Sequence, residues 1–216
     1  MSVPISLRSA LALLVPPRCA ACAAPCSAAE VLCALCEASL GACRATRLAL
    51  PGLDLTLAAA GYEGVAREVV RGLKFGARTE LAARAGQAIA RALAPVPAGG
   101  RVVPVPPAPS RYRRRGFDPA DELAVAVAAE LGLPVARCLA RSDGPRQVGR
   151  RRRERTHDPP RVSLRTPAPE LAFVVDDVLT TGATLAACAR ALRSGGSGSV
   201  IGAAFARSLG AGAIGA

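Results

Sequence analysis

Apolar and polar positions from about residue 55 onward alternate between the period of a strand and the period of a helix. Short apolar runs predict strands at residues 55–62, 101–106, 135–139, 171–175 and 200–206. Apolar positions at helical spacing predict helices at residues 65–75, 79–94, 119–131 and 184–193. Strands that alternate with helices predict an α/β fold, in which helices cover both faces of a parallel sheet.

Two segments depart from this alternation. Residues 46–54 contain the breaker pair Pro51 and Gly52, which predicts a linker. Residues 141–168 are polar, rich in arginine and interrupted by prolines, so we expect a loop or a mobile flap there. The predicted organisation is an N-terminal helix and cysteine-rich module, a linker and an α/β domain, over residues 1–45, 46–54 and 55–216.

The N-terminal module holds most of the cysteines of the chain, at Cys19, Cys22, Cys26, Cys33, Cys36 and Cys43. Cys19 and Cys22 form a Cys-x2-Cys pair. A second pair, Cys33 and Cys36, follows after ten residues. This spacing is typical of a zinc ribbon, in which four thiolates hold a structural Zn²⁺. The alternatives are unrelated free thiols and disulfides, which are uncommon in a chain without an export signal. The two other cysteines of the module either replace one of these ligands or are left over.

Residues 173–185 carry the strongest functional motif. They begin as a buried strand, which we expect to break at Asp176 and Asp177, and continue into a turn of small residues that opens a helix. Adjacent carboxylates at the carboxyl end of a strand can bind a ribose 2′,3′-diol and orient hydrated Mg²⁺. The turn adds backbone or hydroxyl donors for a phosphate at Thr180, Thr181, Gly182, Ala183 and Thr184. An acidic turn with a threonine N-cap is the plainer alternative, but it accounts for only part of this arrangement.

These thirteen residues resemble the phosphoribosyl pyrophosphate (PRPP) loop of the type I phosphoribosyltransferases. Over nearly the whole chain, the order of motifs is similar to that of the ComF family of competence-associated phosphoribosyltransferase-like proteins. The motifs are the paired cysteines, Gly61-Tyr62-Glu63-Gly64, Leu73-Lys74-Phe75-Gly76, Val103-Pro104-Val105-Pro106, Arg113-Arg114-Arg115-Gly116-Phe117-Asp118, Gln147 with Arg155, and the PRPP loop.

The resemblance implies a type I phosphoribosyltransferase-like parallel sheet flanked by helices, with PRPP and Mg²⁺ at the carboxyl ends of the strands. It also implies a flexible hood over the ligand and a link to the uptake of transforming DNA. It gives Asp176 and Asp177 the catalytic role, in phosphoribosyl transfer with pyrophosphate as the leaving group and an unidentified acceptor.

Bound pyrophosphate needs cationic side chains in addition to Mg²⁺. The segment after the 101–106 strand supplies Arg111, Arg113 and Arg115, and one or two of these guanidinium groups can clamp the leaving group. Lys74 is the only lysine of the chain. It either meets a need for a compact ammonium or has survived by chance in an arginine-biased sequence.

The segment predicted to be a flap offers candidates for the hood. We expect Gln147 and Arg155 to belong to it, because a hood closes over the ligand and excludes water. Residues 150–153 are four consecutive arginines. A solvated charge run, a part of the hood and a DNA-contacting strip all remain open for them.

Three positions depart from the related sequences. Asp118 and Asp158 stand where, or near where, the ComF family commonly has asparagine, which puts family-wide substrate or partner contacts in doubt. Thr180 stands where purine-salvage phosphoribosyltransferases carry an acidic residue that manages the proton of the base. The loop therefore lacks that acid–base group, which favours an acceptor that needs no general base, or lost catalysis.

Composition narrows the classes of function. The chain has 28 Lys+Arg against 16 Asp+Glu, a formal charge of +12. Aromatic residues make up only 3% and Trp is absent, which argues against an aromatic platform for single-stranded nucleic acid. No apolar run approaches the ~18 residues of a membrane span, and no signal peptide is recognisable. We therefore expect a cytoplasmic protein without membrane insertion.

Three functions remain open at this stage. The first is a Mg²⁺-dependent phosphoribosyltransferase with an unidentified acceptor. The second is a non-catalytic adaptor that binds single-stranded DNA or the competence machinery, and the third is a PRPP-sensing regulator. The sequence predicts no oligomeric state.

Overall fold

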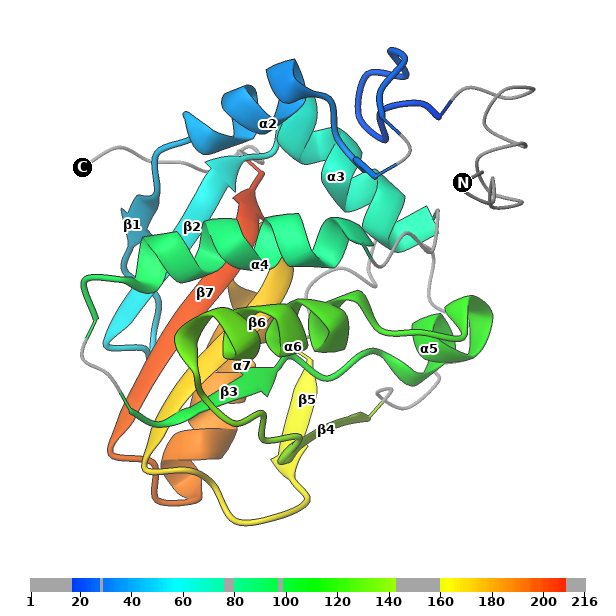
Figure 1. Cartoon of the computed structure of the whole chain (residues 1–216). Helices are drawn as coiled ribbons and strands as arrows, with labels where there is room; N and C mark the ends of the chain where they lie inside the picture. The colour runs from blue at the N-terminus through cyan, green and yellow to red at the C-terminus, as the bar shows by residue number, and fades with distance from the viewer. Residues whose placement is uncertain (1–16, 28, 76–79, 97–98, 143–159, 209–216) are drawn as a thin grey trace, which may run out of the picture.

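The computed structural model of the chain describes residues 17–27, 29–75, 80–96, 99–142 and 160–208. Within them, the central sheet has the strand order β1-β2-β7-β6-β3 (Figure 1). In that order the strands are Thr46–Leu48, Leu55–Gly61, Ser199–Arg207, Leu171–Leu179 and Arg101–Pro104. β1 is an antiparallel edge strand, and the other strands pair in parallel. The fold is therefore α/β with a mostly parallel sheet, as the alternating pattern predicts.

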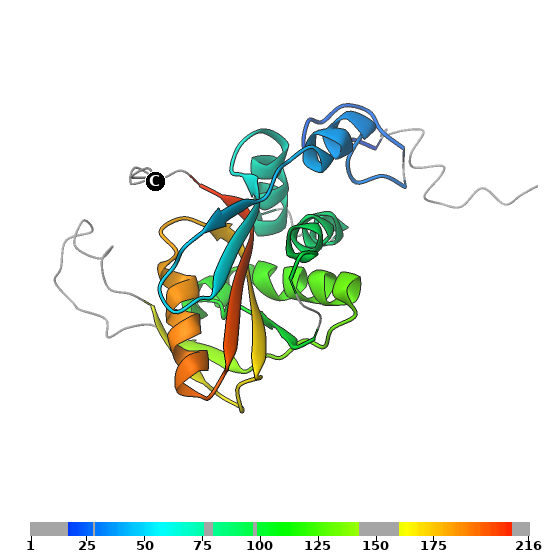
Figure 2. The ribbon, with the colours of Figure 1, turned by 90° about the vertical axis from the view of Figure 1, so that its left-hand side faces the viewer.

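Helices cover both faces of this sheet. The helices of the described residues are α2 (Ala34–Gly41), α3 (Gly64–Phe75), α4 (Glu80–Leu93), α5 (Pro109–Arg115), α6 (Pro119–Leu131) and α7 (Ala183–Ser194). α3, α4 and α6 pack on one face, and α7 packs on the other, as the side view in Figure 2 shows. The flanking helices confirm the layered arrangement that the sequence predicts.

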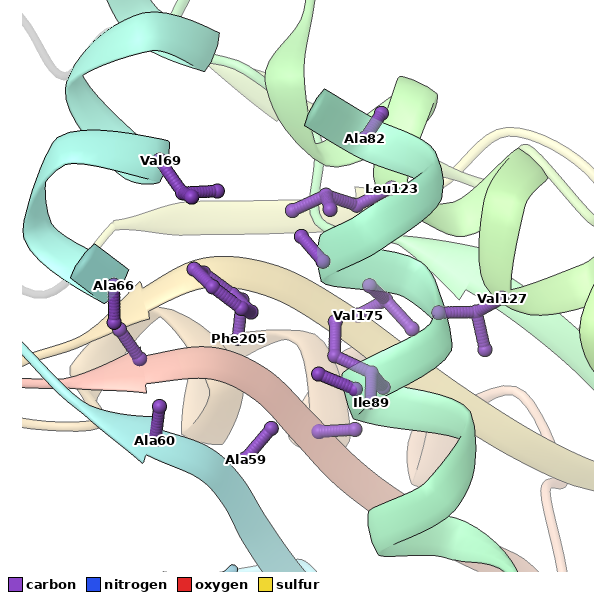
Figure 3. Close-up of a cluster of buried hydrophobic side chains, with 14 of the residues drawn as sticks. Ala59, Ala60, Ala66, Val69, Ala82, Ile89, Leu123, Val127, Val175 and Phe205 are labelled. Atoms are coloured by element: carbon purple, nitrogen blue, oxygen red, sulfur yellow. The ribbon is translucent and has the colours of Figure 1, made fainter. Parts of the chain in front are cut away.

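The larger core lies between the sheet and the helices α3, α4 and α6 (Figure 3). Val69 of α3, Ile89 of α4 and Leu123 of α6 reach it from the helical side, and each is at most 1% exposed. Val175 of β6 and Phe205 of β7 meet them from the sheet. Because these apolar residues recur at helical spacing or at alternate strand positions, burial of one face fixes how each element packs.

A smaller core lies on the α7 side of the sheet. It includes a two-stranded antiparallel sheet, β4 (Leu139–Ser142) and β5 (Arg161–Leu164). Leu139 of β4 and Leu192 of α7 are both buried in this core. The pair β4–β5 therefore lies beside α7. β4 precedes residues 143–159 in the chain, and β5 follows them.

Five local predictions differ from the structure. Arg161–Leu164, inside the segment 141–168 predicted to be a loop or flap, forms β5 because its backbone pairs with β4. Thr46–Leu48, inside the predicted linker, forms β1 because its backbone pairs with β2. The arginine-rich segment after β3 contains the helix α5. The strand predicted at residues 135–139 begins only at Leu139, since Val135 makes an isolated bridge to Val102. β6 does not break at the paired acids, because its pairing with β7 continues to Leu179.

The cysteine-rich segment packs against the α/β core. Leu32 and Leu40 are 1% and 3% exposed and belong to the same hydrophobic cluster as α3. Arg84 of α4 adds an ion pair across this contact, with its Nε 2.7 Å from Oε1 of Glu37 in α2. The cysteine-rich segment is thus anchored on α3 and α4.

Asp54 joins the start of β2 to the start of β7. Its Oδ2 accepts hydrogen bonds from the Ser199 hydroxyl at 2.7 Å and from the Val200 amide at 2.8 Å, and its Oδ1 pairs with Arg193 of α7. The hydrogen bond from Ser199, then the one from Val200 and the Arg193 guanidinium, lower the pKa of Asp54 below its ordinary value. This network fixes the amino-terminal ends of the two strands.

We expect Asp54→Ala to lower the free energy of unfolding by about 1–3 kcal/mol at pH 7, because several charge-assisted hydrogen bonds are lost. A carboxyl whose pKa is lowered by folding stabilises above its unfolded pKa of about 4, so the deficit should shrink as the pH falls below that value. Urea unfolding at pH 7 and pH 3 measures both effects. Glu68→Gln, which breaks only surface pairs with Arg67 and Arg71, should cost less than about 0.5 kcal/mol. An equal loss in the two variants would contradict the role given to Asp54.

Candidate functional site

A cavity of about 430 Å³ opens at the carboxyl ends of the parallel strands. Tyr62 follows β2, Val105 follows β3 and Ser208 follows β7, while Asp176 and Asp177 come from the last part of β6. Further lining residues come from α3, α5, the start of α6, β4 and the start of α7, namely Lys74, Tyr112, Phe117, Asp118, Pro119, Ala120, Arg141, Thr180 and Thr184. In open parallel α/β sheets, ligands bind at this edge.

The two acids of β6 point to opposite faces of the sheet, because side chains alternate along a strand. Asp177 faces the α3 side, where its Oδ1 lies 3.0 Å from Nζ of Lys74. The two side chains are 12% and 24% exposed, so this is a largely desolvated ion pair. Oδ1 of Asp176 accepts a hydrogen bond of 2.8 Å from the amide of Asp177. This hydrogen bond orients Asp176, and no cationic side chain of the described residues forms an ion pair with it.

The cavity holds Asp176 and Asp118 in an environment that favours their protonated forms. Burial, and then the charge of Asp177, raise the pKa of Asp176 to about 7. Asp118 caps α6 by accepting a hydrogen bond of 3.1 Å from the Ala120 amide. Burial raises the pKa of Asp118 to about 6, with the charges of Asp121 and Asp177 adding to the rise. Proton affinities near neutral pH are more common at binding and catalytic sites than elsewhere in proteins.

The turn after β6 leads into α7 through a left-handed glycine. Gly182 precedes α7 with φ +77°, in the left-handed region that favours glycine. A Cβ at this position would also lie 2.6 Å from the side chain of Leu50, so the turn packs tightly on the segment before β2. Thr180 and Thr184 line the cavity, whereas Thr181, Gly182 and Ala183 are not among its lining residues.

The residues predicted to bind pyrophosphate or to form the hood differ in where the structure places them. Lys74 lies in the cavity. Arg113 is exposed on α5 and does not line it. The side chains of Arg111 and Arg115 lie outside the described part of the structure, as do Gln147, Arg155 and the arginines 150–153.

Several lining residues were missed by sequence reasoning. Arg141 is the second-last residue of β4, and Asp118 was noted only as a departure from the related sequences. Tyr62, Tyr112 and Phe117 bring most of the cavity's aromatic surface. The sequence carried no signal for Arg141, because it falls at the start of the segment predicted to be a flap and the chain has many other arginines.

A second candidate site lies in the cysteine-rich segment. The Sγ atoms of Cys19, Cys22, Cys33 and Cys36 all lie within 4.8 Å of one another, close enough to hold one metal ion. Sγ of Cys22 and Sγ of Cys33 are 3.7 Å apart, which fits the edge of about 3.8 Å in a tetrahedron with metal–sulfur bonds of ~2.3 Å. Cys26 and Cys43 lie outside this cluster.

The backbone around the cluster favours a thiolate. Burial by itself would raise the pKa of Cys19, but hydrogen bonds from the amides of Cys22, Cys33 and Ala21 lower it to about 6. The Ala21 amide lies 3.5 Å from Sγ of Cys19. Thiolates are the form of cysteine that binds metals. The lowered pKa of Cys19 therefore favours metal binding by the Cys19–Cys22 pair.

No protein-family model and no curated protein sequence matches this chain. Among the described residues, none of the helices combines the length and the hydropathy needed to cross a bilayer.

Proposed function

We propose that the cavity binds PRPP and that the chain is a Mg²⁺-dependent phosphoribosyltransferase-like protein with an unidentified acceptor. The observation that carries this proposal is the convergence of Asp176, Asp177, Thr180 and Thr184 on one cavity at the carboxyl edge of the sheet. A sugar phosphate needs acceptors for its diol and donors for its phosphate, and these side chains supply both.

Different residues of the chain would bind different parts of the ligand. The carboxylates of Asp176 and Asp177 accept hydrogen bonds from the ribose hydroxyls, and the start of α7 receives the 5-phosphate. Lys74 is placed to move from Asp177 to a phosphate oxygen of the ligand. Bound Mg²⁺ would be oriented by the same two carboxylates, and it would neutralise charge on the pyrophosphate.

We also propose that the four-cysteine cluster holds a structural Zn²⁺. Tetrahedral thiolate sites with two Cys-x2-Cys knuckles suit Zn²⁺, and four protein ligands leave no position for a substrate. A zinc ribbon before a PRPP-binding sheet is the arrangement of the ComF-like proteins that the sequence resembles. Membership of that family, and a role in DNA uptake, are part of this proposal.

The proposal is tested by calorimetric titration of PRPP with Mg²⁺ into the metal-loaded protein and its Asp176→Asn/Asp177→Asn variant. We expect the double variant to bind on the order of 100-fold more weakly, because two charge-assisted sets of hydrogen bonds are lost. The control is Glu80→Gln, an exposed acid at the start of α4 that should leave the affinity within about twofold.

Folded wild-type protein that does not bind PRPP would refute the proposal. Salt-sensitive binding of single-stranded DNA that survives the double substitution would then favour the adaptor function. Equal affinities in the wild type and the double variant would show that PRPP binds somewhere other than this cavity.

A further inference from the structure

Arg141 is a partly buried cation that faces the cavity from β4. Within the described residues, its guanidinium group forms neither an ion pair nor a hydrogen bond. Transfer of a charged group out of water is costly unless a partner compensates for it. An anionic ligand in the cavity would be such a partner.

The other cation of the cavity is already engaged. Lys74 pairs with Asp177 at 3.0 Å on the α3 side of the sheet. Among the described lining residues, Arg141 is therefore the cationic side chain that is available to an incoming anion without breaking an existing ion pair.

Arg141 lies on the α7 side of the sheet, together with Asp176. Both side chains act electrostatically on Cys188 of α7: burial raises the pKa of the Cys188 thiol, Asp176 adds to the rise and Arg141 opposes it. Thr184, which lines the cavity, precedes Cys188 by about one helical turn. β4 and β5 pack beside α7, and Arg141 lines the same cavity as Thr184 of the first turn of this helix.

We propose that Arg141 binds the 5-phosphate group of the ligand, opposite the amino-terminal turn of α7. The assignment rests on the proposed function and adds a specific phosphate-binding residue to it. A guanidinium group donates parallel hydrogen bonds to two oxygens of one phosphate, while the helix start contributes backbone N–H groups and its dipole. One phosphate group is thus held from both sides of the cavity.

The experiment compares two phosphate-containing probes, each titrated with Mg²⁺ by calorimetry. Ribose 5-phosphate carries the phosphate that Arg141 should bind, and pyrophosphate carries the group at the other end of PRPP. Both probes and PRPP itself are titrated into the wild type, Arg141→Gln and Arg141→Lys. Arg161→Gln is the matched control, because Arg161 is exposed on the neighbouring strand β5 and lies outside the cavity.

We expect Arg141→Gln to weaken the binding of ribose 5-phosphate and of PRPP by about 10- to 100-fold, the effect of charge-assisted hydrogen bonds. Arg141→Lys should restore part of the affinity, because it keeps the charge but not the fork of donors. Pyrophosphate binding should change by less than about threefold, and Arg161→Gln should change every affinity by less than about twofold. Equal melting temperatures establish that the variants are folded.

Four outcomes would overturn the assignment. Unchanged binding of PRPP by Arg141→Gln would exclude it and leave the proposed function intact. A loss confined to pyrophosphate would place Arg141 at the opposite end of the ligand. A similar loss for both probes would show that its charge acts on the whole cavity and not on one phosphate. Wild-type protein that binds neither PRPP nor ribose 5-phosphate would refute this assignment and the proposed function together.

Discussion

Cys22→Ser is expected to abolish stoichiometric metal binding and to lower the free energy of unfolding by on the order of 3 kcal/mol. Cys22 is exposed, so the substitution removes a metal ligand without removing core packing. The loss should spread beyond the cysteines, because Leu32 and Leu40 of the same segment are buried in the cluster that includes α3. Elemental analysis of the purified protein and urea unfolding measure the two effects.

Cys43→Ser is the matched control for this prediction. Cys43 is also an exposed thiol of the same segment, but it lies outside the four-cysteine cluster. The control should keep one metal ion per chain and should unfold within about 0.5 kcal/mol of the wild type. Loss of the metal in Cys43→Ser, or its retention in Cys22→Ser, would contradict the ligand set.

Asp176→Asn should stabilise the ligand-free protein at pH 8, by about 1–3 kcal/mol. Folding raises the pKa of Asp176 to about 7, through burial and the charge of Asp177, from about 4 in the unfolded chain. The folded state then binds this proton more tightly than the unfolded state does. The group therefore lowers stability progressively as the pH rises from about 4 to about 7. An asparagine has no such charge and still offers an oxygen to the amide of Asp177.

The difference between Asp176→Asn and the wild type should be largest above pH 7 and should fall towards zero near pH 4. Urea unfolding at pH 4, 6 and 8 measures this dependence. Glu80→Gln, at an exposed position, is expected to differ from the wild type by less than about 0.5 kcal/mol at all three values. If Asp176→Asn were less stable than the wild type at pH 8, the ionised Asp176 carboxylate would not be destabilising the folded state. Ionised carboxylates that destabilise a protein are typical of sites kept for a ligand.

The elements of the fold, and most of their order, follow from local patterns. Residues 65–75 and 119–131 are helical in the sequence prediction and in the structure, because apolar residues at helical spacing form a continuous buried face. The cysteine cluster was also predictable, because two Cys-x2-Cys pairs bring their thiols together through short-range turns. The motif at residues 173–185 placed Asp176, Asp177 and Thr184 at one edge of the sheet for the same local reason.

The edges of the elements were less predictable. β6 continues through Asp176 and Asp177 because β7 supplies backbone partners as far as Leu179. β1 forms inside the expected linker because β2 offers a free edge. Backbone pairing is decided by a neighbouring strand that lies elsewhere in the sequence, so the chemistry of the residues themselves does not show where a strand ends.

The residues that join the motif of β6 and α7 in the cavity are brought there by tertiary structure. Lys74, Asp118 and Arg141 come from α3, the start of α6 and β4, and only the packing of these elements brings them to the acids of β6. The raised pKa values of Asp118 and Asp176, and the ion pair of Lys74 with Asp177, follow from burial and from charges that tertiary packing brings close together. Local patterns therefore determine the elements and the two short motifs, whereas the electrostatics of the cavity arise from contacts that form only when the layers pack.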